Sequence, residues 1–297
     1  MAERLVWERD GFDWPHRGHS RFVRAAGLRW HVQHMGPGRA APALALIHGT
    51  GGSLHSWRGL MPQLAEHFNV WAMDLPGHGF TDAAPAQGMS LPGMARAVQV
   101  LFGELKVAPA LWVGHSAGAA IAARLVLDAP GAARALVGIN AALQPLQGLP
   151  GLVFLPIARL LSGNTLVPRL FAWRAQDAAS VARLVERTGS RIDPQGVALY
   201  ARLVRNAGHV AGALDMMANW QLEPLWRELP QLRLPLLLLV GANDRTLPPD
   251  QSRRAAARVT GAQVQSLPGL GHLAHEEQPA LVLAPLLKFA TDLRVLE

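Results

Sequence analysis

Short apolar runs alternate along this chain with longer segments in which apolar residues recur at helical spacing. Runs of about four to eight apolar residues between turn signals are typical of buried strands. The predicted strands are Arg21–Ala25, Leu28–His34, Ala43–Ile47, Val70–Met73, Ala110–Val113, Leu136–Ile139, Leu234–Val240 and Gln263–Leu267. The predicted helices are Ser53–Glu66, Leu91–Leu105 with Ser90 as N-cap, Ala119–Asp128 and Gln278–Asp292. Buried strands separated by helices predict an α/β fold, with a mostly parallel sheet and helices on both faces.

The sequence pattern predicts no strand between Asn140 and about Gln221. This stretch keeps helical spacing, is rich in Leu, Trp, Met and Arg, and is interrupted by several prolines. We interpret it as a helical cap inserted into the sheet domain. The predicted division is a core of residues 1–141 and 221–297 with a cap of residues 142–220.

Composition narrows the classes of function. The formal net charge is +7, and the basic residues, almost all arginines, are scattered without a basic run, so nucleic acid is not expected as a partner. The chain has no cysteine, which excludes disulfides and thiolate catalysis. No apolar stretch reaches the roughly 20 residues of a spanning helix, and Met1–Asp10 has no signal-peptide pattern. We expect a cytoplasmic protein, with peripheral contact to a membrane left open.

The pentapeptide Gly114–Gly118 reads Gly-His-Ser-Ala-Gly between a predicted strand and a predicted helix. In that context a Gly-x-Ser-x-Gly sequence forms a strained turn that lifts the central serine out of the sheet. Ser116 is therefore the predicted nucleophile. Small residues recur by chance in a chain rich in Ala and Gly, so the flanking elements carry the prediction.

A serine hydroxyl needs a base to take its proton, and the base needs an orienting acid. In this type of sheet the partners follow the serine in the order acid, then histidine, at the carboxyl ends of later strands. Asp244 follows the strand that ends at Val240, and His272 lies on a glycine-rich loop after the last strand. These are the predicted acid and base. Asp250 is the fallback acid, and Asn140 occupies another acid location but is an amide.

The segment His48–Gly52 (His-Gly-Thr-Gly-Gly) follows a buried strand and is predicted to form an oxyanion loop. A tetrahedral intermediate needs preorganised N–H donors. The backbone N–H of Ala117 is one, and that of Thr50 or Gly51 is the second. A plain tight turn is the alternative interpretation. No Gly-Lys-Ser/Thr follows, which argues against a phosphate loop.

Two further patterns have a structural interpretation. Asp74–Gly79 is predicted to be a turn that braces the site, and His78 and His115 are interpreted as packing residues rather than bases. The histidines show no convincing metal-ligand spacing, and the glycine-rich segments match no dinucleotide fingerprint. We therefore expect no metal and no cofactor.

Together these residues resemble the α/β-hydrolase superfamily over essentially the whole chain. A narrower set of motifs resembles the magnesium-chelatase accessory proteins of bacteriochlorophyll synthesis. That resemblance implies a photosynthetic bacterium, a tetrapyrrole pathway and magnesium chelatase as a partner, but it names no reaction. The narrower motifs are Asp13–Pro15, Ser20–Val23, Gly27–Gln33, His55–Trp57, Asp74–Thr81, Gly114–Ala120, Asn140–Ala142, Thr188–Ser190, Met216–Ala218 with Trp220, and Gly269–Glu277.

The cap should set the substrate class, because in this architecture it roofs the nucleophile. Its apolar residues favour a large hydrophobic substrate such as a porphyrin, although most of them are expected simply to pack the cap onto the core. His209 can bind a porphyrin carboxylate or an axial magnesium ion, or can be a satisfied helix histidine, which is the favoured interpretation. The predicted substrate-binding residues are His115, Phe154, Trp173, His209, Met216, Met217 and Trp220.

Two functions follow from these observations. The favoured one is a serine hydrolase that cleaves an ester or related acyl bond of a hydrophobic substrate, plausibly a tetrapyrrole intermediate. The alternative is a non-catalytic tetrapyrrole carrier or scaffold that assists magnesium chelatase. The favoured function uses the whole Ser, Asp and His set and the oxyanion loop, whereas the alternative uses only the apolar cap and the basic charge balance.

Overall fold

The computed structural model describes residues 3–38, 40–145, 168, 170 and 177–296. Its centre is an eight-stranded sheet with strand order β1-β2-β4-β3-β5-β6-β7-β8. The two N-terminal strands pair antiparallel, β2 pairs antiparallel with β4, and every later neighbour pairs parallel. The predicted fold class, a mostly parallel sheet, is confirmed. The strands are β1 Ser20–Ala25, β2 Leu28–Met35, β3 Ala43–Ile47, β4 Asn69–Met73, β5 Leu111–His115, β6 Ala135–Ile139, β7 Leu236–Gly241 and β8 Gln263–Leu267.

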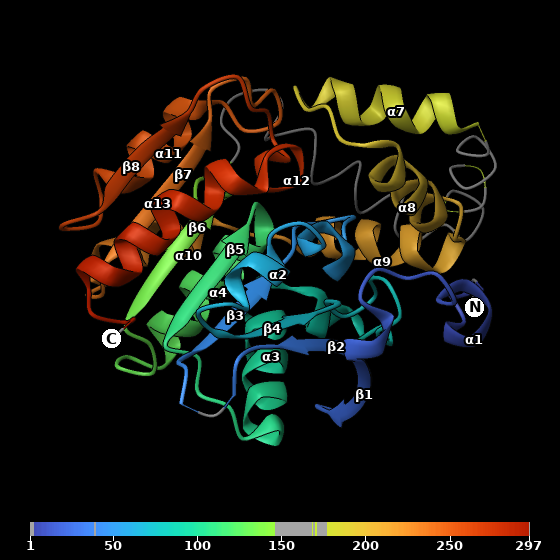
Figure 1. Cartoon of the computed structure of the whole chain (residues 1–297), viewed down its shortest axis with the longest axis horizontal. Helices are drawn as coiled ribbons and strands as arrows, with labels where there is room; N and C mark the ends of the chain where they lie inside the picture. The colour runs from blue at the N-terminus through green and yellow to red at the C-terminus, as the bar shows by residue number, and fades with distance from the viewer. Residues whose placement is uncertain (1–2, 39, 146–167, 169, 171–176, 297) are drawn as a thin grey trace.

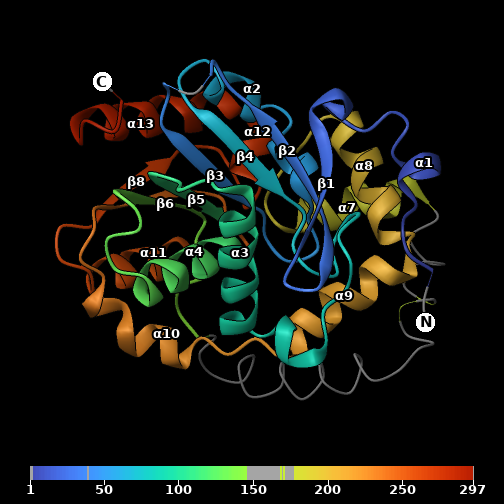
Figure 2. The same cartoon turned by 90° about the horizontal axis from the view of Figure 1, so that it is seen from below.

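Helices cover both faces of this sheet (Figures 1 and 2). Because successive side chains of a strand point to opposite faces, one strand serves two cores. In β3, Ala45 and Ile47 join the apolar cluster that includes α3 and α4 residues, whereas Leu44 and Leu46 join the cluster that includes α13 residues. The core helices are α2 Met61–Leu64, α3 Leu91–Leu105, α4 Ala117–Asp128, α10 Glu223–Glu228, α11 Pro249–Ala256, α12 Ala274–Glu277 and α13 Pro279–Asp292.

One predicted helix is wrong in its continuity. The segment Ser53–Glu66 contains a 3-10 turn at Leu54–Trp57 and a separate short helix, α2, rather than one helix. The backbone N–H of Leu54 donates to the buried Asp74 carboxylate at 2.8 Å, which ties the start of the segment to the end of β4. The predicted Ser90 cap is present, since its hydroxyl accepts from the N–H of Gly93 at 3.2 Å.

Between β6 and β7 the described elements up to α10 are the helices α7 Ala178–Arg187, α8 Pro194–Val204 and α9 Ala207–Ala218. Each begins at a side-chain cap, from Asp177, Asp193 and Asn206 respectively. Figure 1 shows them on the side of the sheet domain where the N-terminal helix α1 (Trp7–Asp10) also lies. The division into a core and a cap at residues 142–220 remains a prediction. Among the described residues no helix is long and apolar enough to cross a membrane.

Candidate active site

Ser116 occupies a strained turn between β5 and α4. Its backbone angles are φ 52° and ψ −119°, outside the ordinary regions for a residue with a side chain. The turn fits only because its neighbours are small: a Cβ on Gly118 would collide with the carbonyl oxygen of Ile47, and one on Gly114 with the backbone of Ala119. Strain of this kind is characteristic of functional serines at a strand–helix turn.

Asp244 and His272 form a buried pair at the carboxyl ends of β7 and β8. The Nδ1 atom of His272 lies 2.8 Å from Oδ2 of Asp244. The other carboxylate oxygen of Asp244 accepts from the N–H groups of Thr246 and Leu247 at 2.8 and 2.9 Å, which fixes its orientation. With Nδ1–H bonded to the carboxylate, the Nε2 atom of His272 can accept a proton.

The loop that carries His272 is held against the residue before the serine. His115 Nε2 donates to the carbonyl oxygen of His272 at 2.8 Å, and the two rings lie 4.8 Å apart. Among the described residues the hydroxyl of Ser116 has no hydrogen bond. The Ser116–His272 contact therefore remains a proposal, and in unliganded sites such contacts are often long and tighten with substrate.

Asn140 links the acid and base loops without being an acid. Its Nδ2 donates to the carbonyl oxygens of Gly271 and His272 at 2.9 and 2.8 Å, and its Oδ1 accepts from the N–H of Gly241 at 2.7 Å. The fallback acid Asp250 lies exposed on α11 in an ion pair with Arg253. Asp244, not Asp250, is the carboxylate that meets His272.

The segment Gly49–Gly52 forms a tight turn against the nucleophile. The N–H of Gly52 donates to the carbonyl oxygen of Gly49 at 3.1 Å, and a Cβ on Gly49 would lie 3.0 Å from that of Ser116. Among the described residues, the N–H groups of Thr50, Gly51 and Ala117 have no hydrogen-bond acceptor. Ala117 is the first residue of α4, where an N–H has no partner inside its helix. Three unpaired donors near Ser116 are what an oxyanion site requires.

Helix α9 supports this turn through His209, and the contacts of its ring agree with the favoured interpretation and not with its alternative role as a substrate-binding residue. The His209 ring is 1% exposed; its Nδ1 accepts from the N–H of Gly79 at 3.1 Å and its Nε2 donates to the carbonyl oxygen of Gly51 at 3.0 Å. Burial lowers the pKa of His209 to about 4, so the ring is neutral. Both nitrogens are in use, so His209 is the satisfied helix histidine and not a ligand for a porphyrin or magnesium.

The other predicted substrate contacts differ in accessibility. Met216 is fully buried, and its sulfur accepts from the hydroxyl of Thr50 at 3.3 Å, whereas Met217 and Trp220 are half-buried. His115 is 4% exposed and packs between His272 and His275, which fits the packing interpretation rather than a substrate contact. The two remaining predictions, Phe154 and Trp173, lie outside the described residues.

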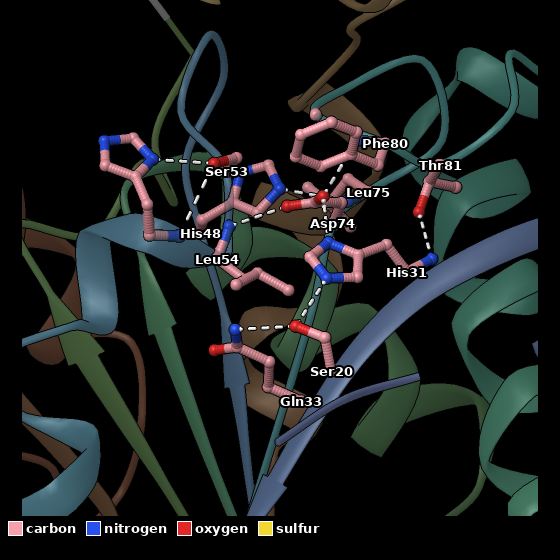
Figure 3. A network of polar contacts seen from close by, with 12 residues as sticks. Ser20, His31, Gln33, His48, Ser53, Leu54, Asp74, Leu75, Phe80 and Thr81 are labelled. Carbon is pink, nitrogen blue, oxygen red and sulfur yellow. Dashed lines mark hydrogen bonds and ion pairs between the residues drawn. The ribbon is translucent and has the colours of Figure 1, made fainter. Parts of the chain in front are cut away.

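A buried polar network at Asp74 braces the same edge of the sheet (Figure 3). One oxygen of Asp74 accepts from the N–H of Phe80 and meets Nδ1 of His31 at 2.9 and 2.8 Å, and the other accepts from Leu54. The Nε2 atom of His31 lies 3.0 Å from the hydroxyl of Ser20. The sequence predicted a bracing turn at Asp74 but not its partner His31, because His31 lies on β2, 43 residues before Asp74 in the chain.

The network reaches the turn Gly49–Gly52 through His48. The N–H of Leu75 donates to Nε2 of His48 at 2.9 Å, and Nδ1 of His48 donates to the carbonyl oxygen of Gly49 at 2.8 Å. Burial alone would raise the pKa of Asp74, but the His31 ring and the donors around the carboxylate outweigh it and lower the pKa to about 2. Asp74 is thus a buried anion. Its hydrogen-bond partners are His31 on β2 and the backbone N–H groups of Leu54 and Phe80, which lie outside the strands.

Glu276 on α12 makes a pH-dependent contact with helix α8. Its buried carboxylate accepts from the hydroxyl of Tyr200 on α8 at 2.7 Å and pairs with Arg58 at 2.6 Å. Burial raises the pKa of Glu276 from its ordinary 4.5 to about 7, against the opposing effect of Arg58. A raised carboxyl pKa makes the folded state retain its proton while the unfolded state ionises.

The free energy of unfolding should therefore fall as pH rises from about 4.5 to about 7, relative to a Glu276→Gln variant. Urea titrations of both proteins at several pH values measure this difference. Glu223→Gln, an exposed change on α10, is the charge-matched control and should track the wild type. Parallel pH curves for wild type and Glu276→Gln would contradict the prediction.

Within the part of the chain that the structure describes, no group of three or more His, Asp or Glu side chains is placed to hold a metal ion. The groups on the loops at this edge of the sheet are an imidazole, a carboxylate and unpaired N–H donors, which are the groups that acyl transfer uses.

Comparison with known proteins identifies a family and several relatives with similar sequences. Residues 42–279 match the family described as alpha/beta hydrolase fold. The chain is 38% identical over 264 residues to the magnesium-chelatase 30 kDa subunit of Rhodobacter capsulatus, covering 89% of this chain and 92% of that protein. It is 29% identical to the pimeloyl-[acyl-carrier protein] methyl ester esterase of Methylococcus capsulatus, covering 82% of this chain and 93% of that one.

Solved structures show the same fold at lower identity. A putative lipase from Acinetobacter baumannii superposes with a TM-score of 0.77 at 19% identity, covering 93% of this chain and 91% of that one. An alpha/beta hydrolase fold protein from Burkholderia ambifaria gives 0.75 at 22%, covering 97% and 100%. At these identities the likeness supports the fold alone.

Proposed function

This chain belongs to the α/β-hydrolase fold family, and from that membership we propose that it is a serine hydrolase acting on an ester or related acyl bond of a hydrophobic substrate. The observation that carries the proposal is the buried Asp244–His272 pair, at 2.8 Å, whose base loop is hydrogen-bonded to His115, the residue before a serine held in a strained turn. A carboxylate-oriented imidazole that can reach a serine hydroxyl is the arrangement that activates serine.

The proposed reaction begins when Oγ of Ser116 attacks the carbonyl carbon and its proton moves to Nε2 of His272. Asp244 stabilises the resulting imidazolium. The negative oxygen of the tetrahedral intermediate accepts hydrogen bonds from the N–H of Ala117 and of Thr50 or Gly51, each worth roughly 3–4 kcal/mol. His272 then returns the proton to the departing alcohol. Water repeats the sequence on the acyl-enzyme and releases the acid.

The substrate class rests on the cap and on the relatives. Leu214 and Met216 on α9 are buried, and Met217 and Trp220 beside them are half-buried. The proposed cap is therefore apolar around the end of α9. One relative is named as a methyl ester esterase and another as a magnesium-chelatase subunit. Together they favour a carboxylic ester of a large apolar molecule, plausibly a tetrapyrrole intermediate of bacteriochlorophyll synthesis.

Esters of increasing apolar size test this substrate class. For p-nitrophenyl esters, kcat/KM should rise from acetyl to longer acyl chains, because each added methylene buried in the pocket contributes about 0.8 kcal/mol. Incubation with a porphyrin methyl ester should release the free acid, measured by mass spectrometry. A flat response to acyl length, with no acid from the porphyrin ester, would contradict the proposed class.

A second candidate is a tetrapyrrole carrier or scaffold for magnesium chelatase, with contact to the membrane surface as part of that role. The name of the 38% identical relative, a subunit of that enzyme, favours it. Complementation separates the two functions. If the chain is a carrier, a Ser116→Ala gene restores pigment synthesis in a strain that lacks the protein; if it is a hydrolase, that gene fails whereas the wild-type gene succeeds.

A further inference from the structure

The turn Thr188–Ser190, between α7 and α8, lies against the loops that carry Asp244 and His272 (Figure 1). The carbonyl oxygen of Thr188 accepts from the N–H of His272 at 3.3 Å and from the N–H of Arg245, the residue after Asp244, at 3.1 Å. One oxygen atom from the region assigned to the cap therefore holds both the acid turn and the base loop.

Ser190 adds a side-chain contact to the same loop. Its hydroxyl oxygen accepts from the N–H of Leu273, directly after His272, at 2.8 Å, and Ser190 is fully buried. A buried N–H that lost this acceptor would have no water to replace it. The conformation of the backbone after His272 thus depends on the hydroxyl of Ser190.

The fit between the turn and the loops is tight. Gly189 has φ +87°, and a Cβ there would collide with the carbonyl oxygen of Asn243. A Cβ on Gly271 would in turn collide with the backbone of Gly189. Gly189 therefore packs directly against Asn243, the residue before Asp244, and against Gly271, the residue before His272. The turn fills the space between the two loops, so neither loop can shift toward it without a collision.

Glu277 provides an independent link between the same segments. One of its carboxylate oxygens accepts from the N–H of Gly271 at 2.8 Å, and the other accepts from the N–H of Arg191 at 3.1 Å. The base loop is therefore tied to the segment between α7 and α8 on both sides of His272.

We propose that the turn Thr188–Ser190 is a positioning element that holds the base His272 and the acid Asp244 in register from the cap side. The proposal rests on the hydrolase function proposed above. Thr188, Gly189 and Ser190 have no proposed contact with the substrate. Their effect passes through the backbone of the two loops, whose alignment sets the direction of the His272 ring toward Ser116. Errors of about 1 Å in such alignment lower rates by up to about 100-fold.

Ser190→Ala tests the proposal, with Ser190→Thr as the conservative rescue. Ser180→Ala is the control, because Ser180 is a half-buried serine on α7 whose hydroxyl, among the described residues, bonds to Asp177 and Arg183 and not to the loops of the site. On the best ester substrate, Ser190→Ala should lower kcat about tenfold with KM within about twofold. Ser190→Thr and Ser180→Ala should match wild type.

A readout that needs no turnover keeps this test separate from the proposed function. The Nδ1 proton of His272, bonded to Asp244, gives a downfield NMR signal that should persist in wild type and Ser180→Ala but broaden or vanish in Ser190→Ala. If wild type hydrolyses no ester yet the signal behaves so, the hydrolase proposal fails and the positioning role stands. An unchanged signal and unchanged kcat in Ser190→Ala overturn the positioning role.

Glu277→Gln covers the case in which Ser190→Ala does not fold. A glutamine retains one acceptor oxygen, so one of the two N–H groups bound by Glu277 loses its partner. The same loss of the His272 signal and the same fall in kcat are expected. A Glu277→Gln protein that matches wild type in both would contradict the proposal.

Discussion

Replacing Ser116 by alanine should lower kcat for ester hydrolysis by at least about 10⁴-fold, with the melting temperature within a few degrees of wild type. The loss is large because the nucleophile and its base act as one unit, and removing either leaves only binding and oxyanion stabilisation. Steady-state rates on a p-nitrophenyl ester measure kcat, and thermal unfolding checks the fold. Alanine fits the site without new contacts, since it deletes one hydroxyl.

Two further variants make this result specific. His272→Ala should cost as much as Ser116→Ala, and the double variant should lose no more than either, because the residues are not independent. Ser20→Ala is the matched control: Ser20 also meets a histidine that contacts an aspartate, but it lies on β1, away from the strained turn. Ser20→Ala should keep most of the activity. Equal turnover in wild type and Ser116→Ala would contradict the proposed chemistry.

Replacing Asp74 by asparagine should destabilise the protein by about 3 kcal/mol or more, because it removes a buried, hydrogen-bonded carboxylate and leaves buried donors without an acceptor. Asp74 and His31 are both fully buried, and the carboxylate accepts from three donors, of which Leu54 and Phe80 contribute backbone N–H groups. An asparagine has one acceptor oxygen and would turn an amino group toward at least one donor. Urea unfolding measures the change.

The control is Asp128→Asn, which removes a surface partner of Arg124. Because Asp128 is 46% exposed, its loss should cost less than about 1 kcal/mol. The dependence of the free energy of unfolding on pH below about 4 gives a second check. The pKa of Asp74 is lowered from 3.8 to about 2, so its contribution is present above about pH 4 and is lost as pH falls toward 2, about 2 kcal/mol in total. An Asp74→Asn protein with wild-type stability and the same dependence on pH would contradict this account.

The sequence predicted the features that depend on local patterns of apolar and turn-forming residues. Apolar runs located all eight strands, with ends displaced by one or two residues at most, such as β7 starting at Leu236 instead of Leu234. The pentapeptide at Ser116 and the loops after β7 and β8 predicted which side chains would gather, and Asp244 does meet His272. These features depend on residues close together in the chain or on the shared edge of a parallel sheet.

The features that sequence reasoning missed depend on contacts between distant segments. The partner of Asp74, His31, is on an antiparallel strand whose neighbour in the sheet no pattern reveals. His209 was open to two roles until its neighbours Gly51 and Gly79 were known. Likewise, the string Thr188–Ser190 stood out in sequence only as part of a resemblance, and its contacts with the loop of His272 come from the fold.

Covalent labelling tests the central claim most directly. A fluorophosphonate reacts with a serine hydroxyl that a neighbouring base activates, so treatment followed by peptide mass spectrometry locates the active serine. The account predicts one adduct, on Ser116, that His272→Ala abolishes while the Asp74 network keeps Ser20 unlabelled. An adduct on Ser20 or another serine, or no adduct on a folded protein, would contradict it.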